Sequence, residues 1–171
     1  MNDSTRAEGP ASRCTVTRAE FGDLERLVPL FDAYRRFYGQ ESAPALGREF
    51  LRERLSQGQS VLFLASGVLA GAEQQALGFS QLYPSFSSVS LQRLWILNDL
   101  FVVPGARKQG VGAELLAAAE QFARETQAKG LVLSTQHGNW AAQSLYRRAG
   151  YAKDNDFAHY ALYLPPAAGS P

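Results

Sequence analysis

The sequence predicts a single domain built around a mixed α/β sheet. Short apolar runs that suit strands alternate along the chain with segments whose apolar residues recur at helical spacing. This alternation is typical of helices packed on a sheet. The chain has 171 residues, 46% of them hydrophobic, which is enough to bury one sizeable core. No internal repeat and no change of composition marks a second domain.

The first half of the chain predicts a strand, two helices and a hairpin. Pro29 lies inside the first helix and should kink or break it, because proline lacks the amide proton of the helical ladder. Gly58 closes the second helix, and a glycine-bearing turn at 67–71 joins the strands of the hairpin. In order, the expected elements are a strand at 14–18, helices at 22–38 and 45–57, and strands at 61–65 and 77–83.

The second half predicts strands and helices in alternation. A long strand leads into a helix that places Leu115, Ala119, Phe122 and Ala123 on one face. This stripe is expected to pack on the sheet. The expected elements are strands at 94–103 and 131–135, helices at 110–128 and 141–149, and one or two final strands within 151–164.

The two ends of the chain are expected to be flexible tails around one domain. Residues 1–12 are rich in small and polar side chains, and residues 165–171 are rich in proline and small residues. Neither composition favours a strand or a helix. The domain is therefore expected to span residues 13–164.

Composition narrows the class of protein. The net charge of +1 is too balanced for nucleic acid to be the main partner. No apolar run approaches the roughly 20 residues of a membrane span, and residues 1–12 lack a hydrophobic signal core, so a cytoplasmic protein is expected. Cys14 has no second cysteine to pair with, and His137 and His159 show no metal-site spacing.

A short glycine-bearing turn says most about function. Arg107-Lys-Gln-Gly110-Val-Gly112-Ala113 lies where a predicted strand ends and a helix begins. Backbone N–H groups at a helix start lack intrahelical partners, and the helix dipole adds partial positive charge there. The two glycines let the main chain approach a bulky anion, and Arg107 and Lys108 add full charges. This segment is therefore predicted to bind phosphate.

The spacing of the glycines excludes two other phosphate-binding motifs. A Walker-type loop requires lysine and a hydroxyl residue where Val111 and Gly112 stand. A dinucleotide fingerprint requires a third glycine where Leu115 stands, and it requires an acidic residue that the strand at 131–135 lacks. Neither an NTPase nor a dinucleotide-binding domain fits the sequence.

Two motifs resemble those of the GNAT superfamily of acyl-CoA-dependent N-acetyltransferases. The segment from Arg107 to Gly112 matches [QR]-x-x-G-x-[GA], the family's pyrophosphate-binding motif. The segment from Asn139 to Tyr151 matches N-x-x-A-x-x-L-Y-x-x-x-G-[FY] at every fixed position. More distantly, the chain is similar to the branch that acetylates polyamines, amino acids and histone tails. The segments that carry this fainter similarity are 34–38 and 96–102.

The resemblance implies a fold, a co-substrate and an assembly. The implied fold is a mostly antiparallel central sheet of about six to seven strands flanked by about four helices. Acetyl-CoA is the implied co-substrate, without a metal. A homodimer formed through the last strands or an exposed sheet edge is the assembly that the resemblance suggests. The residues implied to bind coenzyme A are Leu100, Phe101, Val102, Val103, Arg107, Lys108, Gln109, Gly110, Val111, Gly112, Ala113, Asn139 and Tyr146.

Two residues are candidates for the chemistry of acetyl transfer. An alkylammonium with a pKa of about 10.4 must lose a proton before its nitrogen can attack. Asp99 interrupts an apolar strand and is a candidate base, directly or through water. It could equally attract the substrate's positive charge or satisfy backbone donors. The resemblance places Tyr146 near the sulfur of coenzyme A, where its hydroxyl can donate a hydrogen bond to the leaving thiolate or protonate it; otherwise Tyr146 is a half-buried tyrosine with one hydrogen bond. The family also implies that the backbone N–H of Leu100 or Phe101 polarises the thioester carbonyl.

The expected acceptor is the primary amine of a small molecule, which attacks directly in a ternary complex. Aromatic faces suit a cationic amine, although aromatic residues at helical spacing are often core residues. A protein or peptide amine as acceptor, and a non-catalytic acyl-CoA-binding sensor, remain open alternatives. The candidate acceptor-binding residues are Tyr34, Tyr38, Tyr83, Phe86, Trp95 and Asp99.

Overall fold

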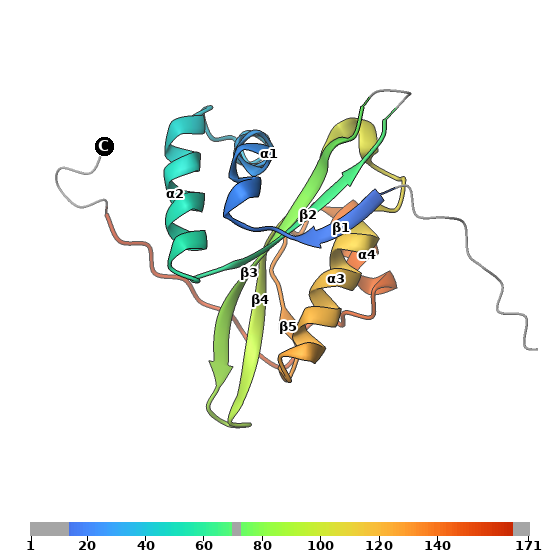
Figure 1. Cartoon of the computed structure of the whole chain (residues 1–171). Helices are drawn as coiled ribbons and strands as arrows, with labels where there is room; N and C mark the ends of the chain where they lie inside the picture. The colour runs from blue at the N-terminus through green and yellow to red at the C-terminus, as the bar shows by residue number, and fades with distance from the viewer. Residues whose placement is uncertain (1–13, 70–72, 166–171) are drawn as a thin grey trace, which may run out of the picture.

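The computed structural model describes residues 14–69 and 73–165, which form one sheet with helices on both of its faces (Figure 1). The predicted tail at 1–12 lies outside the described residues. So do most of the predicted tail at 165–171 and part of the predicted turn at 67–71.

The sheet contains five strands within the described residues, and they lie side by side in sequence order. Neighbouring strands are antiparallel except for the last pair, which is parallel. The second strand is buried along its whole length, as expected of a strand covered on both faces. The strands are β1 (Cys14–Arg18), β2 (Val61–Gly67), β3 (Gln75–Ser87), β4 (Gln92–Val102) and β5 (Leu131–Val132).

Helices cover the two faces of the sheet. The first two helices lie on one face, and the third lies on the other (Figure 1). The first helix continues through Pro29, so the predicted break does not occur. Among the described residues, no helix is long and apolar enough to cross a membrane. The helices are α1 (Leu24–Phe37), α2 (Pro44–Ser56), α3 (Val111–Glu125) and α4 (Trp140–Arg148), with 3-10 turns at Phe21–Asp23 and Pro104–Ala106.

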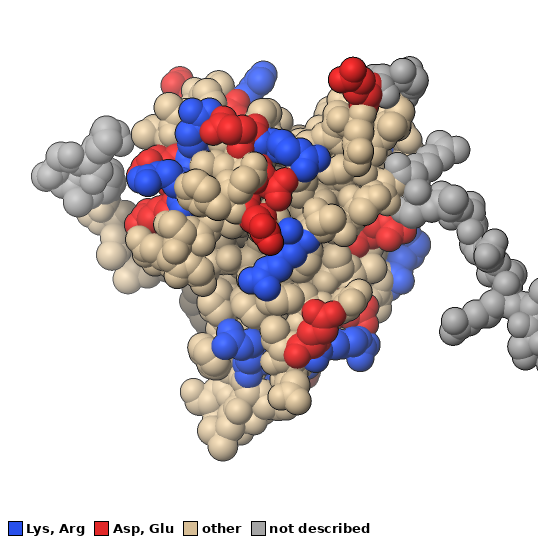
Figure 2. Space-filling view, viewed as in Figure 1, with Lys and Arg blue, Asp and Glu red and all other residues tan. Residues whose placement is uncertain are grey.

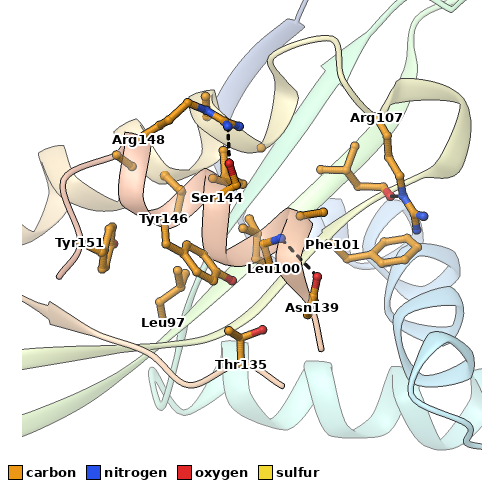
Figure 3. Close-up of a pocket in the computed structure, with 18 of the residues that line it drawn as sticks. Leu97, Leu100, Phe101, Arg107, Thr135, Asn139, Ser144, Tyr146, Arg148 and Tyr151 are labelled. Carbon is orange, nitrogen blue, oxygen red and sulfur yellow. Dashed lines mark hydrogen bonds between the residues drawn. The ribbon is translucent and has the colours of Figure 1, made fainter. Parts of the chain in front are cut away.

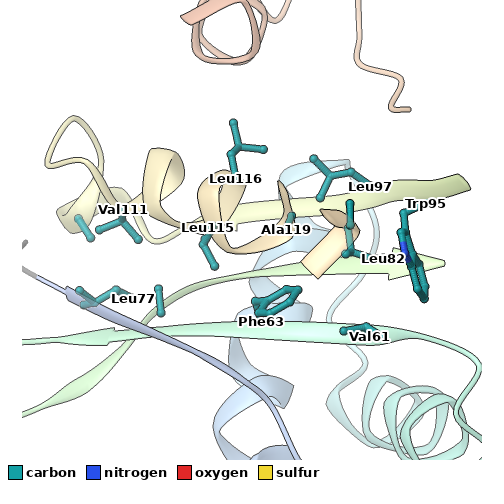
Figure 4. Packing of buried hydrophobic residues seen from close by; sticks show 13 residues of the cluster. Val61, Phe63, Leu77, Leu82, Trp95, Leu97, Val111, Leu115, Leu116 and Ala119 are labelled. Carbon is teal, nitrogen blue, oxygen red and sulfur yellow. The ribbon is translucent and has the colours of Figure 1, made fainter. Parts of the chain in front are cut away.

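Each face of the sheet has its own cluster of buried side chains. On the α3 face, Leu115 and Ala119 of the predicted helical stripe pack with Phe63 and Leu97 of the sheet (Figure 4). On the other face, α1 and α2 cover a second cluster. The buried members of this second cluster are Ala19, Leu24, Leu27, Val28, Leu30, Phe31, Leu51, Leu62, Leu64, Phe79 and Phe101.

A β-bulge at Asn98 determines which face each side chain of β4 meets. Gln81 of β3 lies opposite Asp99, whereas the next residue, Leu82, lies opposite Leu97. Asn98 is therefore an extra residue on β4. The extra residue reverses the alternation of side chains, so that Leu97 packs against α3 while the carboxyl of Asp99 meets a tyrosine of α1.

The sequence predicted more strands than the described residues contain. The final strands expected within 151–164 are absent, because this segment forms neither helix nor strand. The strand expected at 131–135 is reduced to Leu131 and Val132, the only two positions that pair with β4. The expectation of six to seven strands is therefore wrong for the described residues, which contain five. A strand persists only where a neighbour accepts its backbone hydrogen bonds, and the outer edge of β5 has no such neighbour in the described chain.

Removing a buried side chain from α3 tests the packing of the core. Leu115 is fully buried, so Leu115→Ala should lower the free energy of unfolding by about 2–5 kcal/mol through lost burial and a residual cavity. Urea denaturation measures this difference. Gln121→Ala, on the exposed side of the same helix, is the matched control and should change stability by less than about 0.5 kcal/mol. Equal effects of the two substitutions would contradict the described orientation of α3.

Candidate functional site

A cavity of about 960 Å³ opens where β4 and β5 separate (Figure 3). The two strands pair only at Trp95 with Leu131 and at Ile96 with Val132. Beyond this point the free edge of β4, the start of α3 and the inner side of α4 form the walls, and aromatic residues of α1 close the remaining side. The cavity thus joins an unpaired strand edge, a helix start and aromatic side chains.

The turn before α3 presents unpaired backbone N–H groups at this cavity. Within the part of the chain that the structure describes, the N–H groups of residues 108–112 donate to no protein acceptor. Lys108 and Gly110 have left-handed φ angles of 60° and 90°, a geometry that gathers successive N–H groups into an anion-binding concavity. The dipole of α3 adds partial positive charge at the same place. The turn therefore has the geometry of a phosphate site.

Basic side chains line the cavity from the turn and from α4. Arg107 and Lys108 line the cavity from the turn, and Arg148 lines it from α4. The Nε of Arg107 donates to the carbonyl of Val102 at 3.1 Å, and its guanidinium lies 5.6 Å from the ring centre of Phe37. Arg107 and Lys108 add full charge to the partial charge of the helix start.

The two glycines of the first motif have different structural roles. Gly110 adopts the left-handed conformation that most side chains avoid, while a Cβ there would meet nothing within 4 Å. Gly112 is the place where α3 comes close to α4, since a Cβ there would lie 3.0 Å from Cδ2 of Leu145. The sequence predicted that an anion approaches the backbone at Gly112. The structure adds that Leu145, a residue of the second motif, packs closely against Gly112.

The free edge of β4 turns backbone groups towards the cavity. The N–H of Val103 donates to the carbonyl of Leu77 on β3, at 2.9 Å. Backbone groups alternate in direction along a strand, so those of Leu100 and Val102 point the opposite way, and both residues line the cavity. An extended ligand chain with amide groups can pair along this edge as an added strand does.

Tyr146 lies on the inner side of α4, and its hydroxyl points into the cavity (Figure 3). Its ring packs 5.9 Å from the ring of Tyr151. Desolvation, with a smaller contribution from Tyr38, raises the pKa of Tyr146 to about 12. The hydroxyl therefore keeps its proton at neutral pH and can donate it to an acceptor in the cavity.

Asp99 lies behind the cavity wall, at only 5% exposure, and is not a lining residue. Its carboxyl accepts a hydrogen bond from Asn98 Nδ2 at 3.1 Å and another from the Tyr34 hydroxyl. Burial raises the pKa of Asp99, and these two hydrogen bonds oppose that shift. Burial and the nearby carboxylate also raise the pKa of Tyr34 well above its usual range. Asn98 and Tyr34 both line the cavity, so the buried carboxyl of Asp99 is linked to the cavity through its hydrogen bonds with these two side chains.

The residues predicted to bind coenzyme A mostly line this one cavity. Asn139 begins α4, and its Oδ1 accepts the N–H of Ala142 at 3.2 Å (Figure 3). Among the described residues, no group of histidine, cysteine and acidic side chains could hold a metal. The predicted residues that line the cavity are Leu100, Phe101, Val102, Arg107, Lys108, Gly110, Gly112, Ala113, Asn139 and Tyr146, whereas Val103, Gln109 and Val111 do not line it.

The residues predicted to bind the acceptor divide into two groups. Tyr34 and Tyr38 line the cavity and pack edge to face, with their ring centres 5.1 Å apart. Trp95 is buried in the core on the α3 side, where its Nε1 donates to Thr126 Oγ1 at 2.9 Å. The other predicted aromatic residues that do not line the cavity are half-buried Tyr83 and exposed Phe86.

Several lining residues were not singled out from the sequence. Leu145 and Arg148 stand at variable or packing positions of the second motif, so a closer reading of that motif could have found them. Ser134 and Thr135 end the predicted fifth strand, at the place where ligands commonly meet a parallel pair. Phe37 lies in the segment 34–38 that carries the fainter family similarity, but its place in the cavity depends on the tertiary fold and could not be read from one of several aromatic residues.

Comparison with known proteins agrees with this site. The chain is 45% identical over 150 residues to an uncharacterized N-acetyltransferase of Bacillus subtilis (strain 168), YhfO, covering 88% of this chain and 97% of that protein. It is 32% identical over 107 residues to the aminoglycoside N(6')-acetyltransferase type 1 of Klebsiella aerogenes, covering 61% of this chain and 67% of that one. A crystal structure of a probable acetyltransferase matches with a TM-score of 0.81 and 44% identity, over 90% of this chain and 99% of the other.

The profile of the acetyltransferase (GNAT) family matches residues 27–151, a range that contains the glycine turn before α3, the free edge of β4 and α4. The relative that is 45% identical covers nearly its whole length, so the match extends over the entire fold and is not confined to one motif. The chain belongs to the GNAT acetyltransferase family.

Proposed function

We propose that the protein transfers an acetyl group from acetyl-CoA to the primary amine of a small molecule, which attacks the thioester directly within a ternary complex. The observation that carries this proposal is that one cavity joins an anion-binding helix start to a group of tyrosine hydroxyls. Tyr38 and Tyr146 both contribute to the raised pKa of Tyr34, and Tyr38 contributes to that of Tyr146, so the three side chains lie near one another. A nucleotide-bearing co-substrate and an amine can therefore meet in one cavity.

The described residues fit coenzyme A along its length. The free N–H groups of residues 108–112, with Arg107 and Lys108, suit a pyrophosphate. The edge of β4 at Leu100 and Val102 suits the amide groups of the pantetheine arm. Acetyl-CoA supplies an activated thioester, and the N–H of Leu100 is available to polarise its carbonyl.

Tyr34 and Asp99 provide a route for the proton of the amine. An alkylammonium with a pKa of about 10.4 is almost fully protonated at neutral pH, so attack requires a proton acceptor. Tyr34 lines the cavity and donates to the buried Asp99 carboxyl, so a proton accepted at the tyrosine oxygen can pass to the carboxylate. Burial makes Asp99 a stronger base than an exposed aspartate. The same buried carboxylate also attracts a cationic amine. Its role as a base and its role in attracting the amine predict different pH dependences of kcat/KM.

Tyr146 is proposed as the proton donor to the departing thiolate. Its pKa of about 12 lies above that of a thiol at about 8.5, so the tyrosine is protonated whenever the thiolate forms at neutral pH. The hydroxyl stabilises the thiolate by donating a hydrogen bond and then the proton.

A small amine fits the acceptor side better than a protein tail. Aromatic residues of α1 form one wall of the acceptor side. A basic peptide would need an acidic groove, whereas the residues that line the cavity include the acidic Glu120 against the basic Arg107, Lys108 and Arg148. The face shown in Figure 2 carries acidic and basic side chains interspersed over α1, α2 and α3. The relative from Klebsiella aerogenes acts, by its name, on aminoglycosides, which are small molecules with several amines.

Release of free thiol from acetyl-CoA tests the proposal directly. Polyamines, amino acids of both hands, aminoglycosides and basic peptides are offered as acceptors, and the acetylated product is identified by mass spectrometry. Turnover with one of the small amines supports the proposal. Turnover with peptides alone would overturn the small-molecule acceptor, and binding of acetyl-CoA without turnover on any acceptor would favour a sensor.

Gly112→Val should weaken binding of acetyl-CoA at least about tenfold, which corresponds to about 1.4 kcal/mol. The added methyl groups would push against Leu145 and narrow the cavity between α3 and α4. Isothermal titration measures the affinity. Gly22→Val, where a Cβ meets nothing within 4 Å, is the matched control. Unchanged affinity in Gly112→Val would remove the turn from the binding site.

Tyr146→Phe should lower kcat by at least about tenfold, because general acids commonly contribute roughly 10²–10⁴-fold. Affinity for acetyl-CoA should change little. Tyr151→Phe is the matched control, since this neighbouring hydroxyl is buried with no hydrogen-bond partner in the described residues. Equal kcat values for Tyr146→Phe and the wild type at every pH would exclude Tyr146 from proton transfer.

Asp99→Asn distinguishes a base from a charge that attracts the acceptor. Burial raises the pKa of Asp99, so its carboxylate forms only as the pH rises through that value. If Asp99 is the base, kcat/KM of the variant should fall most between that pKa and the amine pKa of about 10.4, and the loss should shrink as the free amine becomes neutral. A loss of equal size across this range would show that Asp99 acts by attraction instead.

A further inference from the structure

Asn98 is an exposed side chain between two buried residues of β4. Leu97 before it and Asp99 after it are only 3% and 5% exposed, whereas Asn98 is exposed and lines the cavity. It is also the extra residue of the bulge, because Asp99 pairs with Gln81 and Leu97 pairs with Leu82. Bulges often redirect a side chain next to a site. This bulge turns a polar group of β4 towards the cavity.

Asp99 fixes the orientation of the Asn98 amide. The Nδ2 of Asn98 donates to the Oδ1 of Asp99 at 3.1 Å. An ionised carboxylate accepts hydrogen bonds only, so the amide cannot turn its oxygen towards Asp99. The Oδ1 of Asn98 therefore faces away from the carboxylate, and no donor within residues 14–69 and 73–165 bonds to it. It is an acceptor that a ligand in the cavity can use.

Tyr34 provides a second acceptor beside Asn98. The Tyr34 hydroxyl donates its proton to the same Asp99 carboxyl, so the lone pairs of the tyrosine oxygen are free to accept. Both side chains line the cavity. Because both also bond one carboxyl group, their two acceptor oxygens lie near each other at the cavity wall. A ligand nitrogen that carries more than one hydrogen can bond to both of them.

Acetylation of a primary ammonium removes two of its three N–H protons. The nitrogen forms a bond to the acyl carbon, and the carbon–sulfur bond breaks with its electron pair on sulfur. One proton passes to the base, the second balances the proton that Tyr146 gives to the thiolate, and the third remains on the nitrogen of the amide product. The site therefore needs one acceptor that takes a proton and another that only holds a hydrogen. A tyrosine linked to a carboxylate suits the first task, and a neutral amide oxygen suits the second.

We propose that the Oδ1 of Asn98 accepts the N–H that the acceptor keeps, while the Tyr34 oxygen accepts the proton that passes to Asp99. This inference rests on the proposed acetyl transfer and adds a residue that selects the class of acceptor. A primary amine keeps one N–H throughout the reaction, so its bond to Asn98 persists into the transition state. A secondary amine keeps none, so the bond is lost as its nitrogen becomes an amide. Asn98 therefore favours primary amines over secondary ones.

Asn98→Leu tests this role, because leucine has nearly the shape of asparagine but no polar side-chain atom. We would measure kcat/KM for the most active primary amine of the acceptor panel and for the same compound methylated on its reacting nitrogen. The wild type should prefer the primary amine, and the ratio of the two values should fall at least about tenfold in Asn98→Leu. Isothermal titration should give an unchanged affinity for acetyl-CoA. Gln92→Leu, at an exposed amide of β4 that does not line the cavity, is the matched control and should keep the wild-type ratio.

Asn98→Asp separates the two polar atoms of the side chain. It keeps an oxygen for the retained N–H and loses the donor to Asp99, so the preference for the primary amine should persist. Asn98 is exposed, so both variants should fold, which circular dichroism checks. Unchanged kinetics in Asn98→Leu, or an equal loss for both amines, would overturn the inference, since an equal loss means that Asn98 acts through Asp99 alone. A wild type that acetylates no amine would instead overturn the proposed acetyl transfer, and this inference with it.

Discussion

β4 is paired on one side along most of its length and on the other side at only two positions, and the site depends on this asymmetry. Pairing with β3 fixes one edge of β4, while the early separation from β5 leaves Leu100 and Val102 without a neighbouring strand at the cavity. The helix that follows β4 begins beside this free edge, so the anion-binding turn and the strand edge come from one continuous segment. If β4 and β5 stayed paired beyond Ile96 and Val132, the sheet would leave no room for the cavity.

The bulge at Asn98 adds the second element of the site. Without the extra residue, Asp99 would lie on the α3 face among apolar side chains, where a carboxylate would have no partner. With it, Asp99 meets the Tyr34 hydroxyl under α1 and stays out of direct contact with solvent. A local irregularity of one strand thus places a buried acid next to an aromatic wall while the remaining strand continues to the turn.

The elements with strong local signals were predictable from the sequence. The apolar stripe at Leu115 and Ala119 predicted α3, and the glycine turn predicted where α3 starts, because both signals depend on neighbouring residues. The placement of Trp95 in the core and the bulge at Asn98 could not be predicted, since both depend on register with β3. The prediction of final strands within 151–164 was wrong for a related reason. Residues with strand-like composition form a strand only where a neighbouring strand pairs with them.

The hydrogen bond from Arg107 to the carbonyl of Val102 has a consequence for solubility. An open strand edge in an unliganded protein can pair with a strand of another chain, and natural proteins often place charged side chains at such edges. Arg107 covers the edge of β4 with a cation that another strand would have to displace, whereas a phosphate-bearing ligand offers that cation a better partner. Arg107 can therefore hinder strand pairing, and so aggregation, when no ligand is bound, and it can leave the β4 edge when a phosphate-bearing ligand binds.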